Sequence, residues 1–401
     1  MQVGVFHIPN TLNLGSMMMA ENFMYYAWSL SGGRLSFVVP TPKKEETERR
    51  LGMALNRKVP VICVQDTPQK GTWRKILKGT LSLKEVKDLL PPVLLNCDVF
   101  VVLGGDSFTE SYDSVRPLVG LYKFFLFKAK LQKKIFLLGH TIGPFSRWRH
   151  PAAIHLLQKL DFITCRDSIS YGYLRRNGLN NVALCADLAF LSLARENTNL
   201  KVEKTSCIIV PSRLLHRYIP YMSYNEYVDF WCTLLEMLTK NFGCKSVLLP
   251  HAMNSPLDDD RLAVKDIAIA MKKGGKFSNQ LEVVDDLLFP YETRQTYFAE
   301  AMLTVTARMH AAISTLVRGG VPINIAYSEK SLGVIGQHFS LEDLVVDVRK
   351  FSSRRELEKK VCSVFQLLAK NYEAVARGIE AKIPFVQELS LQNIKLFLDK
   401  L

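Results

Sequence analysis

The sequence predicts an α/β protein built from two Rossmann-like domains, each a mostly parallel sheet with helices on both faces. Short apolar runs alternate with stretches of helical periodicity along nearly the whole chain, which is typical of βαβ units. The apolar runs are continuous, as expected for strands that are buried on both faces. The length of 401 residues also exceeds what one hydrophobic core usually supports.

The first domain is expected to cover residues 1–195 and the second residues 205–375. In the first domain, apolar runs predict strands at 3–6, 59–64, 98–105, 134–139, 161–165 and 181–185, with helices at 21–30, 83–90, 119–131, 151–160 and 168–177. In the second domain, strands are expected at 207–212, 246–251, 281–285, 302–306 and 322–327, with helices at 227–240, 262–272, near Thr296 and at 309–318. The polar stretch 194–206 is the linker candidate. The chain is helical again from 354, and a C-terminal tail, 376–401, is expected to pack across the domain junction.

The charge balance favours anionic partners. Lys and Arg number 52 against 38 Asp and Glu, a formal net charge of +14. Nucleic acid is the least favoured partner, because the sequence has no helix-turn-helix, zinc-finger or RNP pattern. The other two candidate anionic partners are an anionic membrane face and phosphorylated small molecules. The stretch 119–136 mixes aromatic residues with lysines; a helix that covers the sheet is the plainer interpretation, and an interfacial face for anionic lipid is the alternative.

The cysteines and the N-terminus indicate the compartment. The eight cysteines are scattered without a CxxC pair, which predicts buried reduced thiols and neither a disulfide framework nor a zinc site. The N-terminal MQVGVFHI enters a strand pattern directly and lacks the features of a signal peptide, and no apolar run reaches spanning length. We therefore expect a cytoplasmic protein that is at most peripheral to the inner face of the membrane.

Glycine and histidine occupy several strand-to-helix junctions, where open parallel sheets bind their ligands. Gly104 and Gly105 in VVLGGDS permit close approach of a ligand to the backbone, but the motif is neither GxGxxG nor GxxxxGK[ST], so NAD and Walker-type nucleotide sites are not predicted. His140 lies in the tight GHTIGPF loop, and Asn13 and Gly15 follow the first strand. Each of these residues has a structural interpretation beside the functional one.

Arginine occupies two corresponding junctions. Arg166 ends a strand in TCRDS, and Asp167 after it is expected to cap the next helix. The guanidinium has no evident local partner and suits a carboxylate or phosphate. Arg308 and His310 repeat this arrangement in ARMH. A lone histidine there would more often be structural, but Arg308 two positions away and Lys330 after the next strand favour a functional site.

The run Asp258, Asp259 and Asp260 has the composition of a metal site but precedes a predicted helix. We interpret these residues as first-turn acids that complement the helix dipole. No metal ligand set is therefore assigned.

These junctions, in this order, resemble the polysaccharide pyruvyltransferase family. The resemblance rests on NLGS, VVLGGDS, GHTIGPF, TCRDSISYGYLRRNG, CADLAF, LLPHAMN and, most specifically, ARMHAAISTLVRGGVPINIAYSEKSLG. It implies a GT-B-like pair of domains facing a cleft. It also implies transfer of pyruvate from phosphoenolpyruvate to two hydroxyls of a sugar, which forms a cyclic ketal and releases phosphate without a cofactor. Family members often have GD after the early Asn and GGG in the second motif, where this chain has Gly15-Ser16 and Gly104-Gly105-Asp106.

The resemblance gives roles to the candidate residues. His310 is the expected proton-transfer group, because the reaction needs a group that gains and loses protons near neutrality. The expected donor-binding cations are Arg166, Arg308 and Lys330. Candidate contacts of the acceptor or of phosphate are Asn13, Gly15, Gly104, Gly105, His140 and His251. The acceptor is a sugar, a lipid-linked saccharide or a polysaccharide. The alternatives are a GT-B-like nucleotide-sugar glycosyltransferase and a non-catalytic carbohydrate- or anion-binding member of the family.

Overall fold

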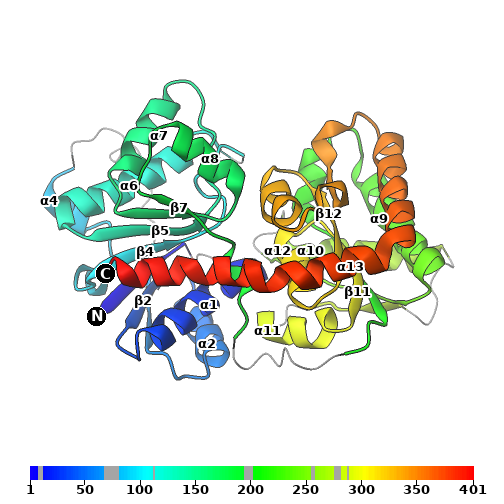
Figure 1. The fold of residues 1–401 in the computed structure, drawn as a ribbon, viewed down its shortest axis with the longest axis horizontal. Helices are drawn as coiled ribbons and strands as arrows, with labels where there is room; N and C mark the ends of the chain where they lie inside the picture. Colours follow the sequence, from blue (N-terminus) through cyan, green and yellow to red (C-terminus); the bar gives the residue numbers. More distant parts are fainter. Residues whose placement is uncertain are drawn as a thin grey trace. The chain divides into compact units, whose positions relative to one another are not determined.

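The protein divides into two compact units. The computed structural model describes residues 1–7, 12–66, 81–111, 113–193, 202–253, 258–274, 281–286 and 289–401, so 194–201 of the expected linker lie outside the described residues. Unit 1 comprises Met1–Thr11, Ser16–Leu191 and Gln387–Leu401, and unit 2 comprises Leu12–Gly15 and Ser192–Val386. Each unit contains a parallel sheet with helices packed on it, so the predicted two-domain α/β fold is confirmed (Figure 1). Unit 2 extends beyond the expected boundary at 375, and the end of the tail belongs to unit 1.

Unit 1 holds a seven-stranded sheet in the order β3-β2-β1-β4-β5-β6-β7. Its strands are β1 (Gln2–Phe6), β2 (Ser36–Thr41), β3 (Val61–Gln65), β4 (Val99–Leu103), β5 (Lys134–His140), β6 (Phe162–Cys165) and β7 (Val182–Leu184). Its helices are α1 (Leu14–Leu30), which starts in unit 2, α2 (Lys44–Ala54), α4 (Leu83–Lys87), α5 (Pro92–Leu95), α6 (Arg116–Leu131), α7 (Arg149–Gln158), α8 (Ser168–Arg176) and the 3-10 turn η1 (Leu188–Phe190). In Figure 1, α6 and α7 lie on one face of this sheet and α1 and α2 on the other.

Unit 2 holds a six-stranded sheet in the order β10-β9-β8-β11-β12-β13. Its strands are β8 (Ser206–Val210), β9 (Lys245–Leu248), β10 (Leu281–Val283), β11 (Ala301–Thr306), β12 (Val321–Ala326) and β13 (Val345–Asp347). Its longer helices are α9 (Tyr224–Phe242), α10 (Asp260–Lys273), α12 (Met309–Val317) and α13 (Arg354–Asp399), which ends in unit 1. The shorter ones are η2 (Arg213–Tyr218), α11 (Pro290–Thr293), η3 (Arg294–Phe298), η4 (Leu332–Gln337), η5 (Glu342–Leu344) and η6 (Val348–Lys350).

Local sequence explains where the helices of unit 2 begin and end. The side chain of Ser223 accepts a hydrogen bond from the backbone N–H of Glu226, and the Glu226 side chain accepts one from Ser223 in return, so a capping box starts α9. Gly243, with a φ of 60°, ends the same helix in the left-handed conformation that glycine adopts most easily. Between these ends α9 buries Tyr227 and Trp231 against the sheet, and this apolar face keeps the helix in place.

Helix α6 covers the sheet of unit 1 with its aromatic side chains. Phe124 and Phe127 are buried, and the ammonium of Lys123 lies 5.5 Å from the ring centroid of Phe127. Lys133 donates hydrogen bonds to the carbonyls of Leu95 and Cys97. These contacts agree with the plainer interpretation of the 119–136 stretch as a sheet-covering helix. In the part of the chain that the structure describes, no helix is long and apolar enough to span a bilayer.

The prediction of reduced thiols was wrong for one pair of cysteines. Cys207 and Cys244 form a disulfide, with their Cα atoms 6.1 Å apart. Cys207 lies opposite Ser246 in the ladder of β8 and β9, so Cys244 is a diagonal neighbour of Cys207. The two residues are 37 positions apart in sequence, and only the pairing of the two strands reveals that they are close. The other six cysteines are free thiols, and five of them are buried.

The elements that the sequence does not indicate include a strand and a helix of unit 1, β2 and α2, and a third element is longer than expected. Strand β2 contains Pro40, and proline usually argues against a central strand. Helix α2 is so rich in charged residues that its apolar periodicity is weak. Helix α1 was expected from 21, but it begins at Leu14, so Asn13 caps this helix and Gly15 lies in its first turn.

Candidate functional site

The strand order of unit 2 reverses between β8 and β11. The chain leaves β8 toward β9 on one side, whereas β11 pairs with β8 on the other side. In open parallel sheets such a reversal opens a crevice at the carboxyl ends of the two strands, and ligands bind there. Val210 of β8 lies opposite Thr306 of β11, and the N–H of Ala307 donates to the carbonyl of Val210 at 2.9 Å. The residues that follow these positions therefore share one edge of the sheet.

Arg308 follows β11 at this edge and is held by two carboxylates. Its Nη2 donates to Asp258 at 2.5 Å and to Asp260 at 2.6 Å, and its Nε donates to Asp260 at 2.9 Å. Burial lowers the pKa of Arg308 and the two carboxylates raise it, with a net shift well above the ordinary value. Its Nη1 makes no hydrogen bond within the described residues.

His251 follows β9 at the same edge and is almost completely buried, with 1% of its surface exposed. Burial lowers its pKa well below the ordinary value, and His310 and Arg308 act in the same direction. The Nε2 atom of this neutral imidazole has no hydrogen-bond partner among the described residues. Arg308 and His310 thus lie close enough to His251 to act on its pKa. The sequence predicted His251 only as a possible contact of the acceptor or of phosphate.

The first turn of α1 is docked onto the residues that follow β9. The N–H of Leu14 donates to the carbonyl of His251 at 3.2 Å, and the N–H of Met253 donates to the carbonyl of Leu12 at 2.8 Å. Asn13 forms an antiparallel bridge with Ala252. The short segment Leu12–Gly15 thus pairs like a strand with 251–253 and belongs to unit 2, although it precedes that unit by almost the length of unit 1.

His310, in the first turn of α12, packs directly against Gly15. The Asn13 side chain caps this turn of α1 by accepting a hydrogen bond from the N–H of Gly15 at 3.1 Å. A β-carbon added to Gly15 would lie 2.1 Å from Nδ1 of His310, so no other residue fits here unless the imidazole moves. The position of His310 therefore explains why glycine occupies position 15 in the NLGS motif.

Lys330 follows β12 at the same edge. Its ammonium lies 5.1 Å from the ring centroid of Tyr327, and Tyr327 stacks on Tyr218 with ring centroids 4.7 Å apart. Strand β12 is the neighbour of β11, so Lys330 follows the strand next to the one that carries Arg308. Unit 2 thus brings together the expected residues Asn13, Gly15, His251, Arg308, His310 and Lys330 at the carboxyl ends of neighbouring strands.

The remaining expected residues lie in unit 1. Gly104 and Gly105 follow β4, and a β-carbon on Gly104 would lie 1.9 Å from the carbonyl oxygen of Gly139. The Nε2 atom of His140 is 3.0 Å from the carbonyl oxygen of Val102, the backbone contact expected of a structural histidine. Burial lowers the pKa of His140 to about 3.

Arg166 has a local partner that the sequence does not reveal. Its Nη1 donates to the buried carboxylate of Asp187 at 2.7 Å, and its Nε donates to the hydroxyl of Thr141 at 2.9 Å. Asp167 caps α8 by accepting from the N–H of Ser170, as predicted. The guanidinium of Arg166 is only 1% exposed and is balanced by a carboxylate of unit 1.

Sequence reasoning missed the residues that hold the candidates in place. Asp260 is fully buried and binds Arg308, whereas the sequence suggested only a helix-dipole role for it. Asp187 and His7 were not singled out at all. The ring of His7, at the end of β1, lies 6.4 Å from that of His140, and burial lowers the pKa of His7 to about 4. An acidic residue in CADLAF, close to a motif that contains Arg166, was the available signal for Asp187.

No group of three or more His, Cys, Asp or Glu side chains in the described ranges could hold a metal ion. The run Asp258–Asp260 is occupied by arginines instead. Asp259 is the N-cap of α10 and binds the guanidinium of Arg261 at 2.9 Å, whereas its two neighbours bind Arg308.

Comparison with known proteins finds structures with the same fold, a curated relative and a matching family model. Solved structures of the UDP-N-acetylglucosamine 2-epimerase of Neisseria meningitidis bound to UDP-GlcNAc (TM-score 0.55, 9% identity, 100% and 98% of the two chains covered) and of S. aureus MnaA with UDP (TM-score 0.60, 11% identity, 100% and 97% covered) share the fold. A curated relative, the amylovoran biosynthesis protein AmsJ of Erwinia amylovora, is 22% identical over 315 residues, 75% of this chain and 73% of AmsJ. The family model described as polysaccharide pyruvyl transferase matches residues 13–329, a range that begins at Asn13 and includes Arg308 and His310. The chain therefore belongs to the polysaccharide pyruvyl transferase family.

Proposed function

We propose that this protein transfers pyruvate from phosphoenolpyruvate to two hydroxyls of a sugar in a surface polysaccharide or its precursor. The products are a cyclic pyruvate ketal and inorganic phosphate. The observation that carries the proposal is the position of His310, which lies in the first turn of α12, two residues after Arg308, at the strand-order reversal of unit 2. The family match and the biosynthetic relative support a transferase that acts on a polysaccharide.

The proposed reaction balances without a cofactor. A proton adds to the methylene carbon of phosphoenolpyruvate, and the adjacent carbon becomes electron-poor. One sugar hydroxyl bonds to that carbon and loses its proton. The bond from carbon to the phosphate oxygen breaks, and the second hydroxyl bonds to the same carbon and closes the ring. One hydroxyl proton replaces the proton taken up by the methyl group, and the other leaves with phosphate or solvent. His310 is the proposed proton-transfer group.

The aspartates of unit 2 change the role that Arg308 can have toward the donor. Arg308 together with Asp258 and Asp260 carries a formal net charge of −1, the sum of one positive and two negative charges. The role proposed for Arg308 is therefore to direct a hydrogen bond from Nη1 to phosphoenolpyruvate, while it adds little net positive charge. Lys330 is the cation of this edge of unit 2 that we propose for balancing the charge of phosphoenolpyruvate. Arg166, in unit 1, stays a donor-binding prediction from the sequence, and so do the acceptor roles of Gly104, Gly105 and His140.

The proposal is tested by incubating the protein with phosphoenolpyruvate and a panel of glycosides. We expect phosphate release that depends on the acceptor, together with a product heavier than the acceptor by one pyruvate less one water. A parallel reaction with UDP-sugars tests the glycosyltransferase alternative, which requires UDP release. Binding of phosphoenolpyruvate without phosphate release on any glycoside would favour the non-catalytic alternative and contradict the proposal.

A further inference from the structure

We propose that Asp260 is the positioning residue of the unit 2 site: one buried carboxylate that fixes Arg308 and, through the backbone after β9, sets the Leu12–Gly15 segment against His310. Its effect on turnover rests on the proposed function. Its effect on the structure of the site does not, and the two are measured separately below.

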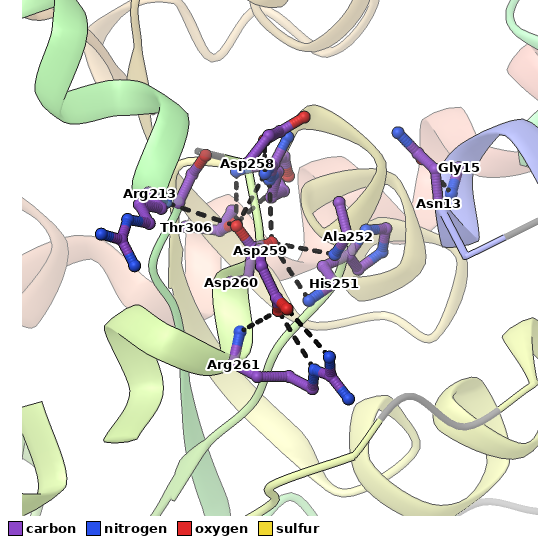
Figure 2. A network of polar contacts seen from close by, with 12 residues as sticks. Asn13, Gly15, Arg213, His251, Ala252, Asp258, Asp259, Asp260, Arg261 and Thr306 are labelled. Atoms are coloured by element: carbon purple, nitrogen blue, oxygen red, sulfur yellow. Dashed lines mark hydrogen bonds and ion pairs between the residues drawn. The ribbon is translucent and has the colours of Figure 1, made fainter. Parts of the chain in front are cut away.

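The carboxylate of Asp260 gathers donors from three strand ends. From the loop after β8, the N–H of Arg213 donates to Oδ1 at 3.3 Å. From the loop after β9, the N–H groups of His251 and Ala252 donate to Oδ2 at 3.2 and 2.9 Å. From the junction after β11, Arg308 donates to both oxygens. Figure 2 shows the Asp260 carboxylate between Arg213 and the His251–Ala252 backbone.

An ionised carboxylate is required for this set of contacts. A carboxylate only accepts hydrogen bonds, and each of its oxygens has room for more than one donor. An asparagine in its place would point its NH₂ group at some of these N–H donors, which would then lose their acceptor. Burial raises the pKa of the Asp260 carboxyl, and Arg308 counteracts that rise. Because Asp260 is 0% exposed, losing its charge leaves the Arg308 guanidinium with a less favourable buried partner.

The effect of Asp260 extends to His310 through a short chain of contacts. Ala252, held by Asp260 through its N–H, pairs with Asn13. Asn13 caps the turn that contains Gly15, and Gly15 leaves no room for any atom between the backbone and the imidazole of His310. A shift of the 251–253 backbone therefore moves the surface on which His310 rests, and the loss of the Asp260 charge separately weakens the hold on Arg308.

The neighbouring aspartates provide matched controls. Asp259 binds Arg261 and caps α10, and Asn is an equally good cap, so Asp259→Asn should leave the site intact. Asp258 accepts a hydrogen bond from Nη2 of Arg308, and its side chain is partly exposed. Asp258→Asn should therefore weaken the hold on Arg308 while every backbone contact of the Asp260 carboxylate stays in place.

The first measurement is hydrogen exchange of the unliganded full-length protein, read in peptides that cover 12–16 and 249–253. Asp260→Asn should speed exchange of the Leu14 and Met253 amides while the amides of β11 and β12 stay protected. Asp259→Asn and Asp258→Asn should exchange like the wild type. Because no ligand is present, this result decides the structural part even if the wild type fails to release phosphate from phosphoenolpyruvate, an outcome that would contradict the proposed function alone.

The second measurement is the kinetics with phosphoenolpyruvate. A displacement of reacting groups by about 1 Å can lower rates on the order of 100-fold, so kcat/KM should fall on that scale in Asp260→Asn and by less than about 2-fold in Asp259→Asn. If Asp260 acts through Arg308, adding Asp260→Asn to Arg308→Lys should reduce kcat/KM by much less than it does alone.

Three results would overturn the inference. Unchanged exchange at Leu14 and Met253 in a folded Asp260→Asn protein is the first. The second is equal effects of Asp260→Asn with and without Arg308→Lys. If Asp260→Asn does not fold, Asp260→Glu keeps the charge and displaces it by one methylene; wild-type exchange and wild-type kcat/KM in that protein would be the third, since positioning depends on where the carboxylate lies.

Discussion

The two units have their strand-order reversals at corresponding places, but the chemistry there differs. In unit 1 the reversal lies between β1 and β4, where His7 and, from the adjacent β5, His140 surround Phe108 with their rings. Burial lowers the pKa values of these histidines to about 4 and about 3. In unit 2 the reversal carries Arg308 in an ion-paired cluster with two aspartates, and His310 is only partly buried.

The difference shows that topology selects the place of a site but not its chemistry. Both sheets satisfy the same rule for where ligands bind. Unit 1 fills the place with neutral rings that need no counter-charge, whereas unit 2 sets ionised groups with fixed partners beside its own buried neutral imidazole, His251. The buried ion pair of unit 1, Arg166 with Asp187, follows β6, two strands from β4 in the sheet. Catalytic proton transfer is therefore expected in unit 2 and structural burial of histidine in unit 1.

The largest expected effect, on turnover, comes from replacing His310 in unit 2, with His140 of unit 1 replaced for comparison. A positioned acid or base contributes about 10²–10⁴-fold to the rate, so His310→Gln should lower turnover on that scale with little change in melting temperature. His140→Gln should instead lower the melting temperature, because it alters a fully buried side chain bonded to the Val102 carbonyl. Turnover and melting are measured on both proteins. A stable His310→Gln variant with near-normal turnover would remove the contrast between the units.

A smaller effect is expected from adding a methyl group to one glycine of each unit. In Gly104→Ala the new carbon meets the Gly139 carbonyl oxygen, a backbone atom that cannot yield, so the free energy of unfolding should fall by about 1–3 kcal/mol or more. In Gly15→Ala it meets the His310 side chain, which can rotate away. Gly15→Ala should therefore lose turnover more than stability. Denaturant unfolding together with kinetics distinguishes the two, and wild-type kcat in Gly15→Ala would show that the position of His310 is not critical.

The smallest effect concerns the dependence of stability on pH. His140 stays neutral in the folded protein down to a pKa of about 3, whereas the unfolded chain takes up this proton below about pH 6.5. Stability from this residue is thus present above pH 6.5 and is lost as the pH falls toward 3. His140→Leu should make the decline between pH 6.5 and 4 shallower by about 1.4 kcal/mol per pH unit, measured by urea unfolding at several pH values. An identical slope in the variant would contradict the burial of a neutral histidine.

Much of the fold was predictable because its strands are continuous apolar runs. Arg308 and His310 could also be identified, since charged groups are unusual where a buried strand meets a buried helix. Their partners could not be identified. Asp187 is 21 residues from Arg166, and Asp260 is 48 residues from Arg308. These pairs form only when the strands of one sheet align, and a single sequence contains no information about that alignment beyond the order of its elements.

The errors have similar physical causes. The Cys207–Cys244 disulfide depends on the pairing of β8 with β9, which a scattered cysteine pattern does not encode. The start of α1 was expected only at residue 21, whereas Asn13 already caps this helix and Gly15 makes space for a side chain almost 300 positions later, His310. Local propensity was correct for each residue, but the tertiary contact decided its use.

The docking of Leu12–Gly15 limits how this protein can be divided or recombined. A polypeptide of residues 192–386 would contain the second sheet with Arg308 and His310, yet it would lack the segment that pairs with Ala252 and lies against the imidazole. Exchange of N-terminal halves between relatives would therefore also replace part of the surface around His310. A gene fusion that joins the first half of one family member to the second half of another should work best when residues 12–15 are taken from the donor of the second half.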